Sequence, residues 1–353
     1  MNILIDIGHP AHVHLLKHFI WEMKEKGHKI IVTVRDIPAA KRLLEIYNID
    51  YILFGRKSFS LIGKAFKQLR YDKLILNLVK KHNIEIGIGS SLTVAQVSRF
   101  SKMKSFILDD DDAEVQPLFT KFAHPCSDYL ISPDVLNFER KKKNHITYPG
   151  YHELAYLHPN RFAPDKAVLK ESGINEGDVF FVLRFNAFKA HHDFRIKGIS
   201  NENKHKLINQ LKDKGKVFIT TEDEIDSEFK EYQLKISPDK IHSLLYYAKM
   251  FIGDSQTMTS EAAVLGTPSF RCNSFAGRIS YLNEEEYKYG LTFGFRPEEF
   301  DFMVRLIKQY LNIPDLKEVW AEKRKKLLSD KIDVSSFFVR LISDYPQSVN
   351  NCK

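Results

Sequence analysis

The chain has 353 residues, which at about 150 residues per domain predicts two domains with separate cores. Hydrophobic residues make up 43% and charged residues 28%, a composition that excludes disordered and fibrous proteins. The 53 lysines and arginines exceed the 45 aspartates and glutamates, which gives a formal net charge of +8. This charge favours an anionic partner, such as a phosphorylated small molecule, a membrane surface or nucleic acid.

The cysteines and the start of the chain bear on the compartment. Three cysteines without C-x-x-C spacing (Cys126, Cys272 and Cys352) exclude a disulfide framework and a thiolate zinc site. The first apolar run contains Asp6 and follows no basic leader, so we expect no signal peptide. No stretch approaches the roughly 18 apolar residues of a spanning helix. We therefore expect a soluble cytoplasmic protein, at most peripheral at the inner face of the membrane.

Short apolar runs alternate with longer amphipathic stretches, a pattern typical of parallel α/β units. The segment from His12 to Lys26 carries apolar residues at helical spacing and ends at Gly27, which predicts a helix. Six strands are predicted in the first half, over residues 2–7, 29–34, 51–54, 84–88, 105–108 and 129–131. Together these units predict one doubly wound domain.

The alternation stops between Asn137 and Asp178, where a basic run and several prolines predict the connection between domains. Four further strands are then predicted over residues 179–184, 217–221, 250–252 and 269–271, and three helices near residues 298–311, 316–328 and 335–343. We predict an N-terminal Rossmann-like domain (1–158), a C-terminal Rossmann-like domain (159–332) and a C-terminal helix (333–353) that packs back on the N-terminal domain. This is an α/β fold class of two doubly wound domains, whose ligand-binding edges face each other across a cleft.

The loop after the first predicted strand contains three histidines, His9, His12 and His14. Gly8 permits a tight turn there, and the amides of the next helix begin near Ala11. Because histidine exchanges a proton most readily at neutral pH, the cluster indicates a functional site. For any one of these histidines, helix capping or packing is the alternative. No acid or cysteine follows at ligand spacing, so a zinc site is not favoured.

A second loop, residues 252–268, is a strand end followed by a polar turn and a helix of small residues. Ser255, Thr257 and Thr259 supply hydroxyls beside helix-start amides, an environment that suits a diphosphate. The carboxylate of Glu261, one turn further, can accept both hydroxyls of a ribose. The alternative is a plain N-cap followed by a capping acid.

The string Gly-Asp-Ser-x-Thr-x-Thr-x-Glu-Ala-Ala-x-Leu-Gly-Thr-Pro, residues 253–268, resembles the nucleotide-sugar motif of the GT-B superfamily. UDP-N-acetylglucosamine 2-epimerase and the lipid II-forming glycosyltransferase share this motif. Residues 8–12 (Gly-His-Pro-Ala-His) and 149–157 (Pro-Gly-Tyr-His-Glu-Leu-Ala-Tyr-Leu) extend the resemblance to domain-of-unknown-function family 354. The likeness covers nearly the full chain. It implies a GT-B fold in which the C-terminal domain holds the donor nucleotide and the N-terminal domain holds the acceptor.

The resemblance also implies roles for individual residues. His12 stands where the lipid II enzyme has a histidine proposed as a base, so it would take a proton from an acceptor hydroxyl. Such a lone base predicts inversion at the anomeric carbon. Residues 236–242 look like the loop that brackets the nucleobase. The residues expected to bind the nucleotide sugar are Gly8, His9, Ile236, Ser237, Asp254, Ser255, Gln256, Thr257, Met258, Thr259 and Glu261.

Some features depart from these relatives. Gly89-Ser90-Ser91-Leu92-Thr93 stands where the epimerase has a Gly-Asp motif, which disfavours epimerisation by the same residues. The polyglycine turn of the lipid II enzyme is replaced by residues 184–193, where Arg184 or Lys189 would offset diphosphate charge.

The acidic run Asp109 to Asp112 ends a predicted strand. One carboxylate, such as Asp111, is a candidate general base or acceptor clamp, and a solvated loop is the alternative. The oxygen-ligand spacing of an EF-hand is absent, so we expect no metal and no other cofactor.

A basic stripe over residues 56–81 carries eight lysines and arginines against one acid, Asp72, with apolar residues among them. It predicts either contact with an anionic membrane or a solvated helix face over an ordinary core. No nucleic-acid-binding module is present, so we expect no nucleic acid partner.

These observations predict a GT-B glycosyltransferase that transfers a sugar from a nucleotide diphosphate sugar, UDP-linked, to a polysaccharide or lipid-linked acceptor in cell-surface polysaccharide biosynthesis. One alternative is a sugar-nucleotide epimerase or hydrolase. A second is a protein that binds a nucleotide sugar without turnover.

Overall fold

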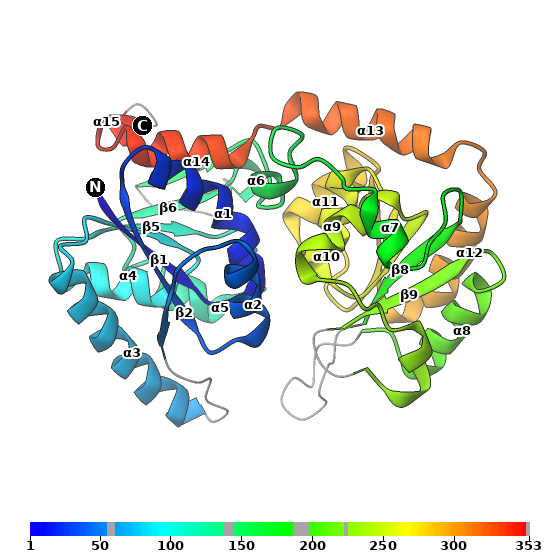
Figure 1. The fold of residues 1–353 in the computed structure, drawn as a ribbon, viewed down its shortest axis with the longest axis horizontal. Helices are drawn as coiled ribbons and strands as arrows, with labels where there is room; N and C mark the ends of the chain where they lie inside the picture. Colours follow the sequence, from blue (N-terminus) through cyan, green and yellow to red (C-terminus); the bar gives the residue numbers. More distant parts are fainter. Residues whose placement is uncertain (55–60, 137, 139–143, 186–197, 222–224, 351–353) are drawn as a thin grey trace. The chain divides into compact units, whose positions relative to one another are not determined.

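The computed structural model describes residues 1–54, 61–136, 138, 144–185, 198–221 and 225–350. The chain divides into two compact units, each described by itself (Figure 1). Unit 1 consists of Met1–Arg161 and Ile332–Lys353, and unit 2 of Phe162–Lys331.

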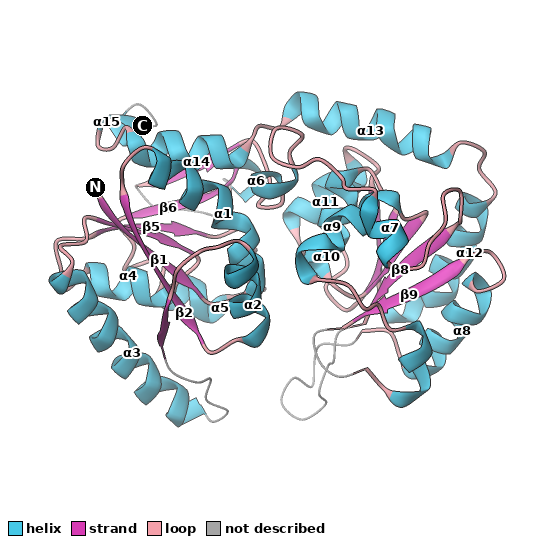
Figure 2. Ribbon diagram, in the orientation of Figure 1, coloured by secondary structure: helices cyan, strands magenta, loops and turns pink. Residues whose placement is uncertain are grey.

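Unit 1 is built on a parallel sheet of seven strands in the order β3-β2-β1-β4-β5-β6-β7, with helices on both faces (Figure 2). The strands are β1 (Asn2–Ile7), β2 (Lys29–Arg35), β3 (Ile52–Phe54), β4 (Ile86–Gly89), β5 (Lys104–Leu108), β6 (Tyr129–Pro133) and β7 (His145–Tyr148). The helices are α1 (Pro10–Glu25), α2 (Pro38–Ile46), α3 (Leu61–Lys81), α4 (Leu92–Ser98), α5 (Pro117–Phe122), α6 (Leu154–Leu157), α14 (Val334–Ser343) and α15 (Gln347–Asn350).

The chain of unit 1 winds outward from β1 to β3, returns to β4 and continues to β7. In such sheets, ligands bind at the carboxyl ends of the strands beside the point of reversal, here between β1 and β4. Gly89 ends β4 with a φ of +142°, and a Cβ at this position would lie 3.3 Å from the carbonyl oxygen of Asp6. Glycine adopts this backbone conformation without strain, so the two strands approach closely at the switch point.

Unit 2 has a parallel sheet of five strands in the order β12-β11-β10-β8-β9, with the reversal between β8 and β10. The strands are β8 (Phe180–Arg184), β9 (Lys216–Thr220), β10 (Met250–Gly253), β11 (Ser269–Cys272) and β12 (Thr292–Phe295). The helices are α7 (Ala167–Glu171), α8 (Asn201–Leu211), α9 (Ile241–Tyr247), α10 (Gln256–Leu265), α11 (Ser280–Tyr287), α12 (Phe300–Leu311) and α13 (Leu316–Asp330). Among the described residues of the chain, no helix has the length and apolarity that crossing a membrane requires.

The prediction of two doubly wound, Rossmann-like α/β domains is confirmed, and each predicted strand has an observed counterpart. Two strands are missing from the prediction, β7 (His-Ile-Thr-Tyr) and β12 (Thr-Phe-Gly-Phe). Both have four residues and lie at a sheet edge, where a strand needs a partner on one side only. The chain crosses between the units at 161/162 and 331/332, where the sequence predicted 158/159 and 332/333.

The C-terminal helix α14 belongs to unit 1 and packs against α1 and α6 (Figure 1). Its N-cap residue, Asp333, accepts a hydrogen bond of 2.7 Å from Nε of Arg161. The rings of Phe337 and Phe338 lie 5.4 and 5.6 Å from the ring of Tyr148 on β7. Helix α14 therefore supplies part of the core of unit 1.

Asp6, the penultimate residue of β1, is a buried carboxylate at the ligand-binding edge of the unit 1 sheet. Its Oδ1 accepts hydrogen bonds from the hydroxyls of Thr33 on β2, at 2.8 Å, and Tyr71 on α3, at 2.6 Å. Its Oδ2 accepts a hydrogen bond of 2.5 Å from Ser91, the N-cap of α4. Burial and the adjacent Asp6 charge raise the pKa of Tyr71, so its phenol remains a donor. One carboxylate thus connects four elements beside the switch point.

We expect Asp6→Ala to lower the free energy of unfolding by about 3 kcal/mol, because three buried hydroxyls would lose a charged acceptor. The loss would be measured as a shift of the unfolding transition in urea or on heating. Asp50→Ala, at an exposed position of the same unit, is the control and should leave that transition unchanged. Equal stability of the two variants would contradict this role for Asp6.

Candidate functional site

The carboxyl ends of β8 and β10 lie side by side at one edge of the unit 2 sheet. Gly253 ends β10, and a Cβ at this position would lie 2.3 Å from the carbonyl oxygen of Arg184, so only glycine fits there. Asp254 N–H donates to the same carbonyl at 3.1 Å. The carbonyl of Asp254 accepts a hydrogen bond of 2.8 Å from Nδ2 of Asn273. The start of the loop after β10 is therefore held from two neighbouring strands.

Helix α10 begins directly after this turn, with Ser255 as its N-cap. The Ser255 hydroxyl accepts a hydrogen bond of 3.3 Å from Met258 N–H. Gln256 and Thr257 are half-buried, so their side chains are partly accessible in the first turn. Thr259 is fully buried, and its hydroxyl donates to the Ser255 carbonyl at 2.6 Å, so it stabilises the helix start. The first turn presents backbone amides and the positive end of the helix dipole.

Glu261 lies one turn further along α10 and pairs with His242 of α9. Nε2 of His242 is 2.9 Å from Oε1 of Glu261, and the side chains are 2% and 6% exposed. Ile236 and Ser237, the expected nucleobase loop, are half-buried in the segment before α9. The pairing fixes the orientation of the Glu261 carboxylate, a feature that the sequence alone did not predict.

Arg184 and Lys189 are the two cations that the sequence predicted near a diphosphate, and the structure describes only Arg184. Arg184 is buried at the end of β8, and its Nη1 donates to the Thr220 hydroxyl at 3.1 Å. Lys189 lies outside the described residues.

Glu285 of α11 supports α10 from its buried side. It accepts a hydrogen bond of 2.6 Å from the Ser260 hydroxyl. Burial raises the pKa of Glu285 to about 8, although Ser260 and the charge of Arg271 oppose the shift. The Glu285 carboxyl is therefore protonated over most of the physiological range.

This protonation predicts that unit 2 loses stability as the pH rises. The pKa of Glu285 is about 8 when folded against a reference value of 4.5, so between these values the folded chain holds a proton that the unfolded chain has released. Unfolding free energies measured across this range should fall with pH less steeply in Glu285→Gln than in the wild type. Glu202→Gln, which changes an exposed glutamate of the same unit, should keep the wild-type slope. An unchanged slope in Glu285→Gln would contradict the assignment.

The histidine loop of unit 1 connects β1 to α1. His9 is the N-cap of α1, and its Nδ1 accepts a hydrogen bond of 3.2 Å from Ala11 N–H. Nδ1 of His12 accepts a hydrogen bond of 3.3 Å from Gly8 N–H. Burial, followed by the nearby His9 and His152, lowers the pKa of His12 to about 3, so the ring is neutral at physiological pH. In the neutral ring the proton is then on Nε2.

His14, the third histidine of this loop, is buried in the packing of α1. Its Nδ1 is 3.1 Å from the Tyr47 hydroxyl, and its ring stacks on Tyr156 at a centroid distance of 5.5 Å. His14 thus takes the packing role that was the alternative for a histidine of this cluster.

The acidic run after β5 forms specific pairs with residues of unit 1. Oδ2 of Asp109 is 2.7 Å from Nε2 of His124, and Asp111 accepts a hydrogen bond from Gln116. Burial, then the charges of Asp110 and Asp109, raise the pKa of Asp111 to about 7. An oxygen from each of Asp109, Asp110 and Asp111 lies within 4.8 Å of the others. Because such clusters are common without an ion, and these carboxylates already have partners, we assign no metal site to them.

Asp110 pairs with His152, which follows β7. Oδ2 of Asp110 is 3.0 Å from Nδ1 of His152. Burial alone would raise the pKa of Asp110, but the charge of His152 and its hydrogen bond lower it overall. Burial alone would lower the pKa of His152, but the charge of Asp110 and its hydrogen bond raise this pKa overall. Each partner therefore favours the charged form of the other.

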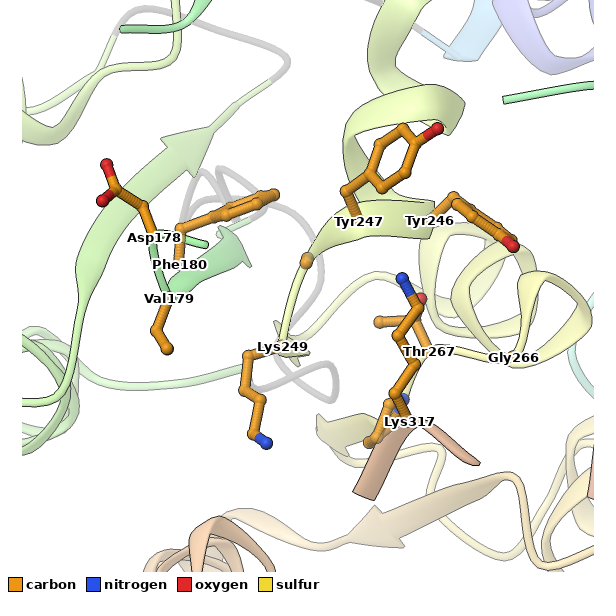
Figure 3. A pocket seen from close by; sticks show the side chains of 11 residues that line it. Asp178, Val179, Phe180, Tyr246, Tyr247, Lys249, Gly266, Thr267 and Lys317 are labelled. Atoms are coloured by element: carbon orange, nitrogen blue, oxygen red, sulfur yellow. The ribbon is translucent and has the colours of Figure 1, made fainter. Parts of the chain in front are cut away.

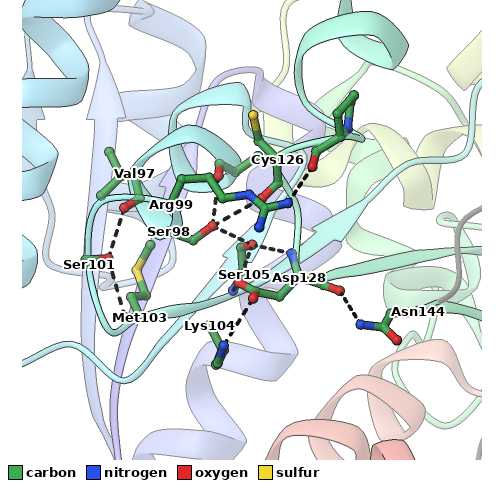
Figure 4. Close-up of polar contacts among 12 residues, drawn as sticks. Val97, Ser98, Arg99, Ser101, Met103, Lys104, Ser105, Cys126, Asp128 and Asn144 are labelled. Atoms are coloured by element: carbon green, nitrogen blue, oxygen red, sulfur yellow. Dashed lines mark hydrogen bonds and ion pairs between the residues drawn. The ribbon is translucent and has the colours of Figure 1, made fainter.

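A polar cluster holds the chain between α5 and β6 (Figure 4). The Ser105 hydroxyl lies 2.9 Å from that of Ser98 and 3.1 Å from Oδ2 of Asp128. Nη2 of Arg99 donates to the carbonyl of Pro125 at 2.6 Å. These contacts hold the segment between α5 and β6 against the start of β5. The same segment carries His124, which pairs with Asp109 directly after the end of β5.

A cavity of about 180 Å³ in unit 2 lies away from these residues (Figure 3). It is lined by the amino-terminal ends of β8 and β11 and by side chains such as Tyr246, Tyr247 and Lys317. Since parallel α/β sheets bind ligands at the carboxyl ends of strands, we assign it no role in the candidate site.

The structure thus brings Asp254 to Glu261 together at one edge of unit 2, and His9, His12 and the acidic run into one region of unit 1. The residues missed from the sequence are the partners His242, His124 and His152. His152 and His242 lie within segments that the resemblance singled out, so the motifs were the available signal. The residues with which these histidines pair are distant in sequence, and no regular spacing along the chain indicates the pairing.

Two doubly wound units, each with polar residues at the carboxyl ends of its strands, define the GT-B class of fold. The chain belongs to the family described as protein of unknown function DUF354, whose model matches residues 1–288. An uncharacterised protein of Methanocaldococcus jannaschii is 25% identical over 312 residues, which cover 81% of this chain and 86% of that protein.

Solved structures with the same fold include enzymes of two kinds. UDP-GlcNAc 2-epimerase from Neisseria meningitidis, bound to UDP-GlcNAc, has a TM-score of 0.66 and 10% identity over 97% of this chain and 100% of that chain. The glycosyltransferase SsfS6 of Streptomyces sp. SF2575 has a TM-score of 0.60 and 11% identity over 98% of this chain and 100% of that chain. At such identities the likeness establishes the fold alone.

Proposed function

We propose that this protein is an enzyme that uses a nucleotide diphosphate sugar, UDP-linked, and transfers the sugar to a carbohydrate or lipid-linked acceptor. The observation that carries the proposal is the edge of the unit 2 sheet where β10 ends. Gly253 there approaches the neighbouring strand β8 closely, and the start of α10 and the buried Glu261–His242 pair follow it. A diphosphate binds at helix-start amides, and a fixed carboxylate one turn away suits the two hydroxyls of a ribose.

The donor class draws support from the Neisseria epimerase, whose structure holds UDP-GlcNAc. Within the expected donor site, Ser255 to Thr257 would lie beside the diphosphate and Glu261 beside the ribose. Thr259 would act indirectly, through the first turn that its hydroxyl stabilises. Gly8, His9, Ile236, Ser237, Arg184 and Lys189 stay in the proposal as further donor contacts.

Transfer needs a group that removes the acceptor proton while the nucleoside diphosphate departs. Unit 1 supplies the candidates for this step, namely His12, from the sequence, and the acidic run with Asp111. The pKa of His12, about 3, implies that a reaction using it as base would be independent of pH near neutrality.

Epimerisation of the donor is the second candidate function, favoured by the similarity in fold to the Neisseria 2-epimerase. The two functions differ in their products, since an epimerase changes the sugar without an acceptor. A binding protein without turnover would release neither a modified sugar nor a nucleoside diphosphate.

We also propose that the acceptor is reached at the inner face of a membrane, in cell-surface polysaccharide synthesis. Helix α3 has Ile75 and Leu78 buried, while Leu69, Arg70 and Lys73 are exposed. This mixture of apolar and basic residues suits an anionic lipid surface. Of the predicted stripe over residues 56–81, residues 56–60 lie outside the described residues.

Nucleotide binding predicts that UDP and UDP-sugars stabilise the wild type, by about 2.7 kcal/mol at about 100 times the Kd. Glu261→Ala should lose most of this stabilisation, because the ribose would lose its carboxylate acceptor. The measurement is a thermal-shift series with nucleoside diphosphates and their sugars.

The matched control is Glu228→Ala, which removes the glutamate of an exposed pair in unit 2, where Oε2 of Glu228 is 2.9 Å from Nε2 of His205. It should respond to ligand like the wild type. No shift of the wild type with any nucleotide would refute the donor site, and an unchanged shift in Glu261→Ala would refute the role of Glu261.

A further inference from the structure

Asp110 of the acidic run, which is half-buried, forms a pair with the buried His152, and the sequence did not predict this pairing. Nδ1 of His152 is 3.0 Å from Oδ2 of Asp110, and His152 is only 8% exposed. The carboxylate holds Nδ1, so the proton on the ring that can exchange with a ligand is the one on Nε2.

Nε2 of His152 is buried and has no hydrogen-bond partner among the residues that the structure describes. The hydroxyl of Tyr148, on β7, is also buried without a hydrogen-bond partner among the described residues. Burial, and after it the charge of Asp110, raises the pKa of this hydroxyl. Buried polar atoms without hydrogen-bond partners are rare in folded proteins, because each one loses its hydrogen bonds to water. Two of them near one carboxylate indicate that a ligand oxygen completes this region.

The hydrogen bond at Nδ1 of His12 has the opposite direction to that at Nδ1 of His152, because His12 accepts there and His152 donates. Its Nδ1 accepts the Gly8 N–H at 3.3 Å, so the neutral ring carries its proton on Nε2 and can only donate there. His152 has its Nδ1 bonded to a carboxylate and its Nε2 without a partner, the arrangement in which Nε2 takes up a proton. The charges of His152 and Asp110 both act on the pKa of His12.

We propose that His152 is the general base of the transfer reaction, positioned by Asp110, with His12 as a neutral donor beside it. This inference rests on the proposed function. The proton of the acceptor hydroxyl moves to Nε2 of His152 as the acceptor oxygen bonds to the anomeric carbon. The bond from that carbon to the diphosphate breaks, and its electron pair leaves with the nucleoside diphosphate. Asp110 stabilises the imidazolium that forms. Nε2 is buried, so the side chains around it move when the acceptor enters.

The proposal predicts a pH profile that differs from that of a reaction based on His12. The charged and titratable groups that act on His152 are Asp109, Asp110 and Asp111 after β5, and His12 on α1. Burial lowers the pKa of His152, but the three carboxylates, Asp110 above all, raise it overall above 6.5. Turnover should therefore rise with pH through a value above 6.5, whereas a base with the pKa of His12, about 3, would give a flat profile.

The test is the release of UDP from UDP-N-acetylglucosamine with water as the acceptor, measured from about pH 5 to about pH 9. His152→Gln should lower kcat about 100-fold or more and leave the thermal shift with UDP unchanged. Asp110→Asn should move the rise in activity to lower pH, because the charge that raises the pKa of His152 is removed. His145→Gln is the control, since His145 lies on β7 and its Nε2 is 2.7 Å from the Ser132 hydroxyl. It should behave like the wild type.

Wild-type turnover in His152→Gln would overturn the assignment of the base and leave the donor proposal intact. Binding of UDP-N-acetylglucosamine without release of UDP by the wild type would have the same meaning. If the wild type binds no nucleotide sugar at all, the proposed function fails together with this inference. Should His152→Gln not fold, Asp110→Asn decides, since an unshifted pH profile would overturn the proposal.

Discussion

The carboxylate of Asp6 is the constraint on which the functional edge of unit 1 depends. A buried charge is stable only when hydrogen bonds replace its hydration, and here three hydroxyls from different elements do so. These hydrogen bonds offset the desolvation cost of the buried carboxylate, and they fix the positions of the four elements that they join. The loop with Gly8 and His12 begins two residues later, so its start is as fixed as the strand itself.

Unit 2 achieves the same order by another physical route. Its switch point contains no comparable hub of hydroxyls in the described residues, and the close approach of Gly253 to the Arg184 carbonyl fixes the strand ends instead. This close approach leaves the amides of the first turn of α10 at the edge of the sheet. One unit thus offers titratable side chains and the other offers oriented dipoles, a division that suits proton transfer in the first and anion binding in the second.

The sequence predicted the fold class because strand runs rich in Ile, Val and Phe alternate with helical stretches along the whole chain. It missed β7 and β12, whose four residues carry too few apolar positions to stand out. The proposed donor edge was predicted from residues that are contiguous, from Asp254 to Glu261. The Asp110–His152 pair was not, because it joins loops after two different strands and depends on the register of the sheet. Even the motif that contains His152 does not indicate which of four neighbouring aspartates it meets.

The path of the chain has a consequence for how the protein forms. Unit 1 begins at Met1 but is completed only by Ile332–Lys353, whereas unit 2 is one continuous segment. During synthesis from the amino terminus, all residues of unit 2 leave the ribosome before helix α14 of unit 1 does. Until α14 arrives, the rings that pack on Tyr148 are absent, and the core of the first unit is open on that side. Unit 1 therefore begins before unit 2 along the chain and is completed after it.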